Sequence, residues 1–342
     1  MPTHIGLDIG SESIKLVAVE KTGDKYVLVA MSHGPTPVGA LKSKNEIEEQ
    51  SLIAAVKAVV DSAKAKTKDV VCALHESDVF TRVVQMPSLS DRELSSAVRW
   101  EAEQVIPLPI DEVIYQHQVI RRPEKDVPGA KMDVFLIAAP KLLVDRYQRI
   151  LLGAGLHPKA LETEMVALAR SLVGNNPYSP TTLILDFGAE ATDMSVVHGG
   201  FIAFTRSISS GGAALSRAIA AELGFEMAQA ESYKRTYGLM ANQMEGKINH
   251  AMQPVIAIVL EEVKRVLAYY AEHNPKDPVR RITLAGGSAR LPGFVVEIAT
   301  ALGIEVQMAD PFFNISHRPT QELADEGPRF AVAAGLALKE DV

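Results

Sequence analysis

Residues 4–18 read His-Ile-Gly-Leu-Asp-Ile-Gly-Ser-Glu-Ser-Ile-Lys-Leu-Val-Ala. Apolar residues alternate on both sides of the Gly-Ser-Glu-Ser stretch, which predicts two strands joined by a turn. A turn rich in glycine and serine can direct several backbone N–H groups at one anion. Taken alone, an Asp-x-Gly turn is more often a plain hairpin. The candidate ligand contacts are a Mg²⁺-binding carboxylate that acts through water, three turn residues and one cation, namely Asp8, Gly10, Ser11, Ser13 and Lys15.

The second half of the chain repeats this pattern. Residues 186–193 read Asp-Phe-Gly-Ala-Glu-Ala-Thr-Asp and again lie between two apolar strands. An internal repeat of this kind predicts two similar lobes. Two such hairpins that face each other would hold a polyphosphate from both sides and offer Asp8 and Asp186 to one metal ion. Gly188 and Thr192 are further candidates for contact with phosphate.

Three other motifs fit a nucleotide. Gly211 and Gly212 follow a strand and open a helix, and Gly286, Gly287 and Ser288 follow another strand, where paired glycines let the backbone lie against a planar ligand. Glu231 and Lys234 share one face of a helix, where they could bond ribose hydroxyls or form an ordinary helix ion pair. The GxGxxG fingerprint and the GxxxxGK[ST] P-loop are both absent from the sequence, which removes two common nucleotide folds.

The region between the repeats contains an insertion. Ser90 to Glu93 form a capping box that opens a helix towards Gln104. Strands at 113–120 and 132–138 follow, joined by a charged loop at 121–131, and then a helix at 141–152. We expect residues 86–158 to form an inserted α/β subdomain. Further helices are expected at 212–222, 227–237, 253–272, 294–301 and 330–339.

Taken together and in this order, the motifs resemble those of the actin/sugar-kinase/Hsp70 ATPase superfamily. The resemblance treats Ser209–Gly212 as the first connecting segment, Gly286–Gly293 as the adenosine motif and Ala331–Gly335 as the second connecting helix. It implies an α/β, actin-like (ribonuclease H-like duplicated) bilobed ATPase fold with an FtsA-type 1C subdomain insertion. The expected boundaries are 1–85 for the first part of subdomain 1A, 86–158 for 1C, 159–178 for the rest of 1A and a hinge, 179–225 for 2A, 226–277 for 2B, 278–325 for the return of 2A, and 326–342 for a C-terminal helix that packs on 1A.

Two segments narrow the resemblance, one at 100–112 and one at 204–238. They are similar to the PilM family of type IV pilus assembly proteins, which is itself similar to the cell-division actin FtsA. The resemblance implies that the chain binds ATP (or ADP) with Mg and is recruited to the inner membrane by the cytoplasmic N-terminal peptide of PilN. It implies indirect association with PilO and PilP, contact with pilus motor ATPases and the platform protein, and self-association. Pilus, twitching, competence and secretion machines use this module.

In the family the PilN peptide docks in a groove that involves subdomains 1A and 1C. Such a groove should be apolar, so the candidate contacts are Val105, Ile106, Leu108 and Ile110. Each of them can equally pack inside 1C. Trp100, the single tryptophan, fits either a half-buried core position or an interface.

Composition limits the function classes. A net charge of −7 argues against binding to nucleic acid, and one cysteine excludes an intrachain disulfide or a cysteine-based metal cluster. The sequence shows no signal peptide and no apolar run long enough to span a bilayer, so we expect a cytoplasmic chain that meets the membrane only through PilN.

Catalysis is left unassigned. Glu190 and Asp193 flank the second turn, but neither fits a water-positioning role clearly, so we expect nucleotide binding with weak or absent hydrolysis. The alternatives are a filament-forming cell-division actin of the FtsA type, or a small-molecule kinase of the same superfamily.

Overall fold

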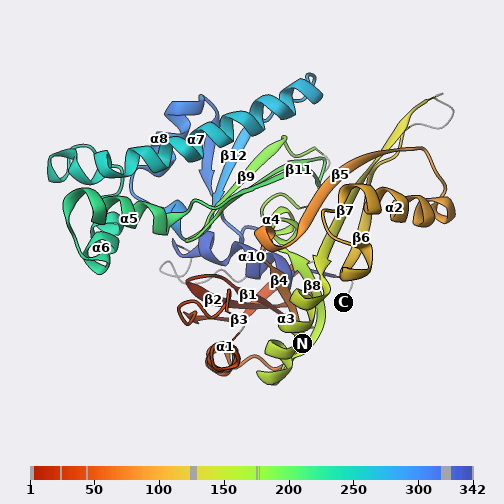
Figure 1. Cartoon of the computed structure of the whole chain (residues 1–342), viewed down its shortest axis with the longest axis horizontal. Helices are drawn as coiled ribbons and strands as arrows, with labels where there is room; N and C mark the ends of the chain where they lie inside the picture. Colours follow the sequence, from red (N-terminus) through yellow and green to blue (C-terminus); the bar gives the residue numbers. More distant parts are fainter. Residues whose placement is uncertain are drawn as a thin grey trace.

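A computed structural model describes residues 4–23, 25–43, 45–123, 129–174, 176, 178–316 and 325–340. Two lobes of the same topology stand one above the other, and a third, smaller sheet lies beside them (Figure 1). The predicted duplication is therefore confirmed at the level of strand order.

The first lobe is built on a five-stranded sheet of order β3-β2-β1-β4-β8. An antiparallel meander supplies β1 (Ile5–Ile9), β2 (Ser13–Thr22) and β3 (Lys25–Pro35), while β4 (Asp69–Leu74) and β8 (His157–Thr163) add in parallel. The helices α1 (Glu46–Ala63) and α3 (Lys141–Gly153) share a buried apolar core with this sheet.

The second lobe repeats this design with the order β11-β10-β9-β12-β13. Its strands are β9 (Thr182–Phe187), β10 (Thr192–His198), β11 (Phe201–Ile208), β12 (Arg281–Ala285) and β13 (Glu305–Met308). Its helices are α5 (Gly212–Leu223), α6 (Met227–Tyr237), α7 (Lys247–His273) and α8 (Phe294–Leu302). Helix α7 begins six residues before the predicted start, with Pro254 inside it.

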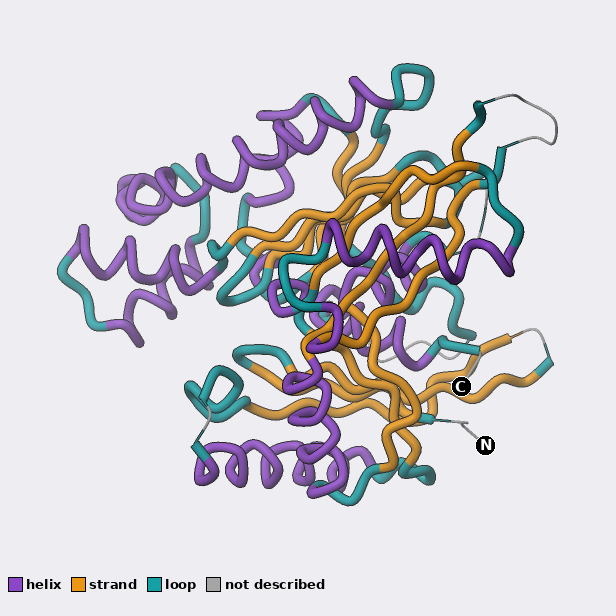
Figure 2. The backbone as a smooth tube through the Cα atoms, turned by 45° about the vertical axis from the view of Figure 1, so that its right-hand side comes forward, coloured by secondary structure: helices purple, strands orange, loops and turns teal. Residues whose placement is uncertain are grey.

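The third sheet has the order β5-β7-β6 and its own core. It consists of β5 (Phe80–Pro87), β6 (Val113–Arg121) and β7 (Lys131–Pro140), with α2 (Asp91–Val105) against it. Figure 2 shows α2 lying across these strands. The predicted capping box is present, because the Ser90 side chain and the Glu93 carboxylate each engage the backbone of the other. Residues 124–128 of the predicted hairpin loop lie outside the described part of the chain.

The packing differs from the predicted limits of the insertion at both ends. Strand β5 begins at Phe80 and pairs with β7 along its whole length, so the third sheet starts before residue 86. Helix α3 buries Val144, Tyr147 and Ile150 in the core of the first lobe, and β8 joins the first-lobe sheet. The sequence alone could not reveal these limits, because the apolar face of α3 does not indicate which sheet the helix will cover.

Two helices fill the space between the lobes, α4 (Glu164–Leu172) and α10 (Gly327–Ala337) (Figure 1). Their apolar side chains join a core that includes Ile184 and Ala285 from the second lobe. The backbones approach closely, as the small residues of α10 predict: a Cβ on Gly335 would lie 1.9 Å from the Ala167 carbonyl oxygen. Asn175 and Pro177 of the expected hinge, residues 317–324 of the expected 2A return and residues 341–342 lie outside the described residues.

Candidate functional site

The first predicted turn is a tight hairpin whose Asp8 and Lys15 face each other across β1 and β2. The Gly10 N–H donates to the Ser13 carbonyl oxygen (3.1 Å), and the Lys15 ammonium donates to Asp8 Oδ2 (2.9 Å). A Cβ on Gly10 would lie 2.7 Å from the Lys15 nitrogen, so glycine leaves room for this ion pair. Ser11 lies in the turn, and Ser13 Oγ accepts a hydrogen bond from Arg329 of α10. Burial raises the pKa of Asp8, and Lys15 opposes this effect.

The second turn reproduces the first. The Gly188 N–H donates to the Ala191 carbonyl oxygen (3.0 Å), and Asp186 lies opposite Asp193 across β9 and β10. Burial, together with the negative charges of Glu164, Asp193 and Asp8, raises the pKa of Asp186 well above its usual range. The charges of Asp8 and Asp186 therefore interact, as expected if the two repeated turns lie near each other.

A cation would suit the buried carboxylates at the two turns. Among the described residues, no group of three or more His, Cys, Asp or Glu side chains is arranged to ligate a metal directly. The carboxylates of Asp8, Asp186 and Glu164 nevertheless repel one another in a buried place. A divalent ion held through water and phosphate oxygens would relieve that repulsion, which is the binding mode that Mg²⁺ prefers.

The glycine and serine motifs of the second lobe meet at the start of α5. The N–H groups of Gly212 and Ala213 donate to the carbonyl oxygens of Gly188 and Ala189 (2.9 and 2.8 Å), and Ser288 Oγ donates to Gly188 as well (2.8 Å). Gly211 caps this helix, and Thr192 of the second turn donates its hydroxyl to the Ser210 carbonyl oxygen (2.5 Å). Hydrogen bonds thus join three motifs that are separate in the sequence: the second turn, Ser209–Gly212 and Ser288.

This arrangement corrects one expectation. Ser209–Gly212 lies between β11 and α5 inside the second lobe, so it does not connect the lobes. The chain crosses from the first lobe to the second after α4 instead. A glycine-rich turn before a helix looks the same in a sequence whether it crosses between lobes or closes a meander.

Glu231 and Lys234 form more than an isolated helix pair. Glu231 accepts hydrogen bonds from Ser216 (2.5 Å), Lys234 (2.6 Å) and Arg235 (2.5 Å). Although burial acts in the opposite direction, these donors lower the pKa of Glu231 to about 2. Lys234 also donates to the Gly212 carbonyl oxygen (2.9 Å), and Arg235 reaches Glu12 in the first turn (2.8 Å). The predicted ribose contacts therefore belong to a network that crosses between the lobes.

The glycines after β12 have different surroundings. Gly286 has φ +88°, and a Cβ there would lie 2.4 Å from Asp186 Oδ1, so this position requires glycine. Its N–H donates to the Pro328 carbonyl oxygen of α10 (2.9 Å). Gly287 has room for a side chain, since a Cβ would meet only Arg329 at 3.6 Å.

The sequence analysis missed a buried cluster of charged residues that interacts with Asp8 and Asp186. His75 Nδ1 lies 3.1 Å from Glu164 Oε1, and the Glu76 N–H donates to Glu164 Oε2 (3.1 Å). Burial favours a neutral His75, but the charge of Glu164 prevails and raises the pKa of His75 to about 9. Burial raises the pKa of Glu76 to about 8, and burial with the charge of Glu164 raises that of Asp193 to about 7. A usable signal existed for His75, Glu76 and Glu164, because they follow the carboxyl ends of the parallel strands β4 and β8.

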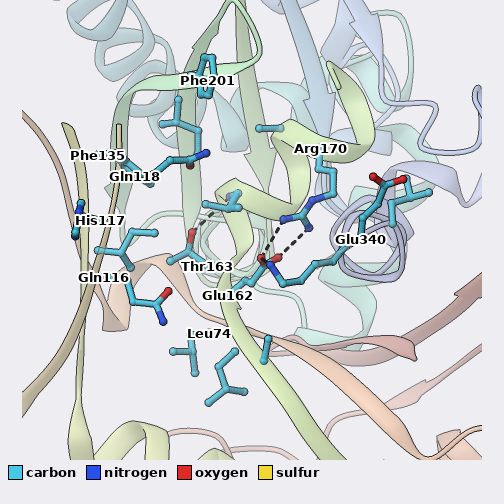
Figure 3. A pocket seen from close by; sticks show the side chains of 18 of the residues that line it. Leu74, Gln116, His117, Gln118, Phe135, Glu162, Thr163, Arg170, Phe201 and Glu340 are labelled. Carbon is cyan, nitrogen blue, oxygen red and sulfur yellow. Dashed lines mark hydrogen bonds and ion pairs between the residues drawn. The ribbon is translucent and has the colours of Figure 1, made fainter. Parts of the chain in front are cut away.

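A groove of about 1190 Å³ lies beside the lobes (Figure 3). Its walls are β6, β8, α4, the start of β11 and the residues after α10. Strands β6 and β8 are the outer strands of their sheets in the described part of the chain. At one end Glu162 accepts hydrogen bonds from Arg170 (2.8 and 3.0 Å) and from Lys339 (2.8 Å).

None of the four apolar residues predicted for partner binding lines this groove within the described residues. Ile106 is buried in the core of the third sheet, and Val105 and Ile110 pack against that core. Leu108 is 42% exposed and Trp100 is 70% exposed. The residues that line the groove instead come from β6 and β8, whose proximity is a property of the tertiary fold.

No helix in the described ranges is both long and apolar enough to cross a membrane.

Comparison with known proteins assigns the chain to a protein family. The family model of type IV pilus assembly protein PilM matches residues 6–341. In a solved PilM-PilN type IV pilus biogenesis complex, a chain with a TM-score of 0.84 and 30% identity aligns over 98% of this chain and 97% of its own length.

More distant relatives support the fold. Cell division protein FtsA of Streptococcus pneumoniae is 20% identical over 345 residues, which cover 90% of this chain and 75% of FtsA. MreB5 of Spiroplasma citri, solved with AMPPNP, is 14% identical with a TM-score of 0.55 and covers 97% of this chain and 95% of its own. The duplicated lobes thus have the expected actin-like ATPase fold, with the third sheet as its inserted subdomain. The chain belongs to the family of type IV pilus assembly protein PilM.

Proposed function

We propose that this protein is a nucleotide-regulated adaptor of the type IV pilus, which binds the cytoplasmic N-terminus of PilN in the groove between β6 and β8. The observation that carries the proposal is the groove itself. It is bounded by two outer strands, and the similar chain in the PilM-PilN complex superposes over nearly its whole length.

Outer strands are suited to an extended peptide. Unpaired backbone groups on such a strand can bond an added strand, while side-chain pockets select the sequence. Ile114 and Ile120 of β6 and Ala160 and Leu161 of β8 supply apolar surface. The ion pairs of Glu162 with Arg170 and Lys339 add a charged end that can bond a polar group of the peptide.

The nucleotide site is proposed at the two turns. The turn amides, Lys15 and Ser288 would contact phosphate, Asp8 and Asp186 would hold Mg²⁺ through water, and Gly286 and Gly287 would border the base. Support comes from the interaction between the charges of Asp8 and Asp186, from the hydrogen bonds that join the second turn to α5 and Ser288, and from an actin-like neighbour solved with AMPPNP.

Hydrolysis is proposed to be slow or absent. Phosphoryl transfer to water needs a group that orients the nucleophile. The best-placed buried carboxylate, Glu164, has one oxygen engaged by His75 and the other by the Glu76 N–H. ATP or ADP would then act as a regulatory ligand. Association with PilO, PilP and the pilus motor would follow indirectly, through PilN at the inner membrane.

A calorimetric titration with a synthetic peptide of the PilN N-terminus tests the groove. The variant Ile114→Asp, at a residue that is 45% exposed in the groove, should weaken binding at least tenfold. The matched control Ile258→Asp, at a 57% exposed residue of α7 outside the groove, should bind like the unchanged protein. Equal affinity of the Ile114→Asp variant and the control would contradict the proposal.

A further inference from the structure

One hairpin of the second lobe touches both proposed sites. Strand β10 begins at Thr192, in the second phosphate turn, and ends at His198. The chain then turns at Gly199 and Gly200, and Phe201 opens β11 on the wall of the groove. Seven strand residues at about 3.3 Å each separate the two ends by roughly 20 Å.

The hairpin is stiff enough to transmit a displacement from the turn at one end to Phe201 at the other. Strand β10 pairs with β9 from Thr192 to Val197 and with β11 from Thr192 to His198. As a central strand, with one shift of register after Val196, it cannot bend freely without breaking ladder hydrogen bonds. A displacement of the phosphate turn must therefore move Phe201 as well.

The groove end of the hairpin faces the third sheet. Phe201 lies at one end of the groove, above Gln118 and Phe135 (Figure 3). It is 38% exposed, whereas its neighbour Ile202 is buried with Phe135 in the core between the lobes. One wall of a groove that otherwise belongs to the first lobe and the third sheet is thus supplied by the second lobe.

A polar contact in the middle of the hairpin links it to β5. The hydroxyl groups of Thr205 and Thr81 are 2.8 Å apart, and Thr81 donates to Glu76 (2.6 Å). Glu76 in turn donates its N–H to Glu164, at the start of α4 between the lobes. Any rotation of the lobes shifts the hairpin against these partners.

We infer that the β10–β11 hairpin is the lever by which nucleotide binding changes the affinity of the peptide groove, with Phe201 as its contact element. This inference rests on the proposed function. A nucleotide that draws the turn at Gly188 towards the turn at Gly10 rotates the second lobe about the core between the lobes. Phe201 then moves relative to β6, and the width of the groove changes.

The test measures both ligands together. The PilN peptide is titrated into the full chain with and without Mg·AMPPNP, and AMPPNP is titrated with and without the peptide. We expect the Kd of each ligand to change by the same factor, about fivefold or more, because coupling between sites is reciprocal. Phe201→Ala should reduce that factor to less than twofold while both ligands still bind. Val296→Ala, at a 68% exposed apolar residue of α8 outside the groove, should keep it.

The outcomes separate the inference from the function on which it rests. If either ligand fails to bind the unchanged protein, the proposed function is wrong. If both ligands bind and Phe201→Ala keeps the full coupling factor, the lever is wrong and the proposed function stands. If both bind and their affinities are independent, the lever and the regulatory role of the nucleotide are wrong, and the two proposed binding sites stand.

Discussion

Asp186 is a residue at which a purely structural role and a ligand-binding role predict opposite effects of substitution on stability. Burial and three negative neighbours raise its pKa, so its charge destabilises the unliganded fold. We expect Asp186→Asn to raise the melting temperature of the protein without ligand. The same variant should lose Mg-dependent binding of ATP by at least tenfold, because one of the two carboxylates that face the metal is gone.

Calorimetry and thermal unfolding together test this prediction. Nucleotide at 100 times its Kd should stabilise the unchanged protein by about 2.7 kcal/mol, and a variant that binds at least tenfold more weakly should gain at most about 1.4 kcal/mol at the same concentration. A variant that is less stable without ligand, yet binds nucleotide normally, would show that Asp186 serves only the fold.

Glu76 gives a prediction about pH. Burial raises its pKa in the folded state to about 8, above the ordinary value of 4.5, so the folded protein binds more protons than the unfolded chain. The free energy of unfolding should therefore fall as pH rises from about 5 to 8, by at most about 1 kcal/mol per pH unit for this one group. His75, whose pKa is raised to about 9, should add a further decrease in the free energy of unfolding as pH rises above 6.5.

Denaturant unfolding of the metal-free and nucleotide-free protein at several pH values measures this slope. Glu76→Gln, which keeps the shape of the side chain, should flatten the fall between pH 5 and 8. An unchanged slope in that variant would show that a group other than Glu76 binds the extra protons in the folded state.

At the scale of elements, α6 of the second lobe contacts the first turn of the other lobe. Arg235 of α6 bonds both Glu231 of its own lobe and Glu12 of the other. Both partners in the pair between lobes are more than 60% exposed, so the contact is weak, of the order expected for a surface ion pair. We expect Glu12→Gln to release nucleotide about two- to fivefold faster, since opening the lobes no longer breaks this contact.

Stopped-flow displacement of a fluorescent ATP analogue measures the dissociation rate. Glu46→Gln, at an exposed residue of the same lobe that is distant along the chain, is the control and should leave the rate unchanged. If Glu12→Gln behaves like this control, the ion pair does not hold the cleft closed.

The elements that the sequence predicted well are those with a local signal. Alternation of apolar residues placed β1, β2, β9 and β10, and the capping box placed the start of α2. The two glycine turns that follow β1 and β9 were predicted from the same short motifs. The sequence analysis assigned α3 to the insertion, whereas the helix packs in the core of the first lobe. The sheet against which a helix packs depends on the tertiary fold, and no local sequence pattern predicts it.

The candidate sites divide in the same way. Residues within one turn, such as Asp8 and Lys15, could be paired from their spacing. His75 and Glu164 could not, because they meet only when β4 and β8 become neighbours. The four apolar residues chosen for partner binding illustrate the same limit: Ile106 is as apolar as a docking residue should be, and the fold uses it as core.

At the scale of the whole molecule, the two lobes, the third sheet and the helices between them carry two proposed ligand sites. The proposed nucleotide site uses residues of both lobes, and the groove uses the first lobe, the third sheet and the tip of the β10–β11 hairpin. A peptide of PilN should therefore mark β6 and β8, whereas a nucleotide should mark the two glycine turns and the start of α5.

Hydrogen–deuterium exchange of the full chain, alone and with a saturating PilN N-terminal peptide, tests the proposed docking site most directly. The account predicts slower amide exchange in β6, over Val113–Arg121, and in β8, over His157–Thr163, because both outer strands gain a hydrogen-bonding neighbour. Protection confined to residues 100–112, with β6 and β8 unchanged, would contradict it and return the partner site to α2 and the apolar segment that follows it.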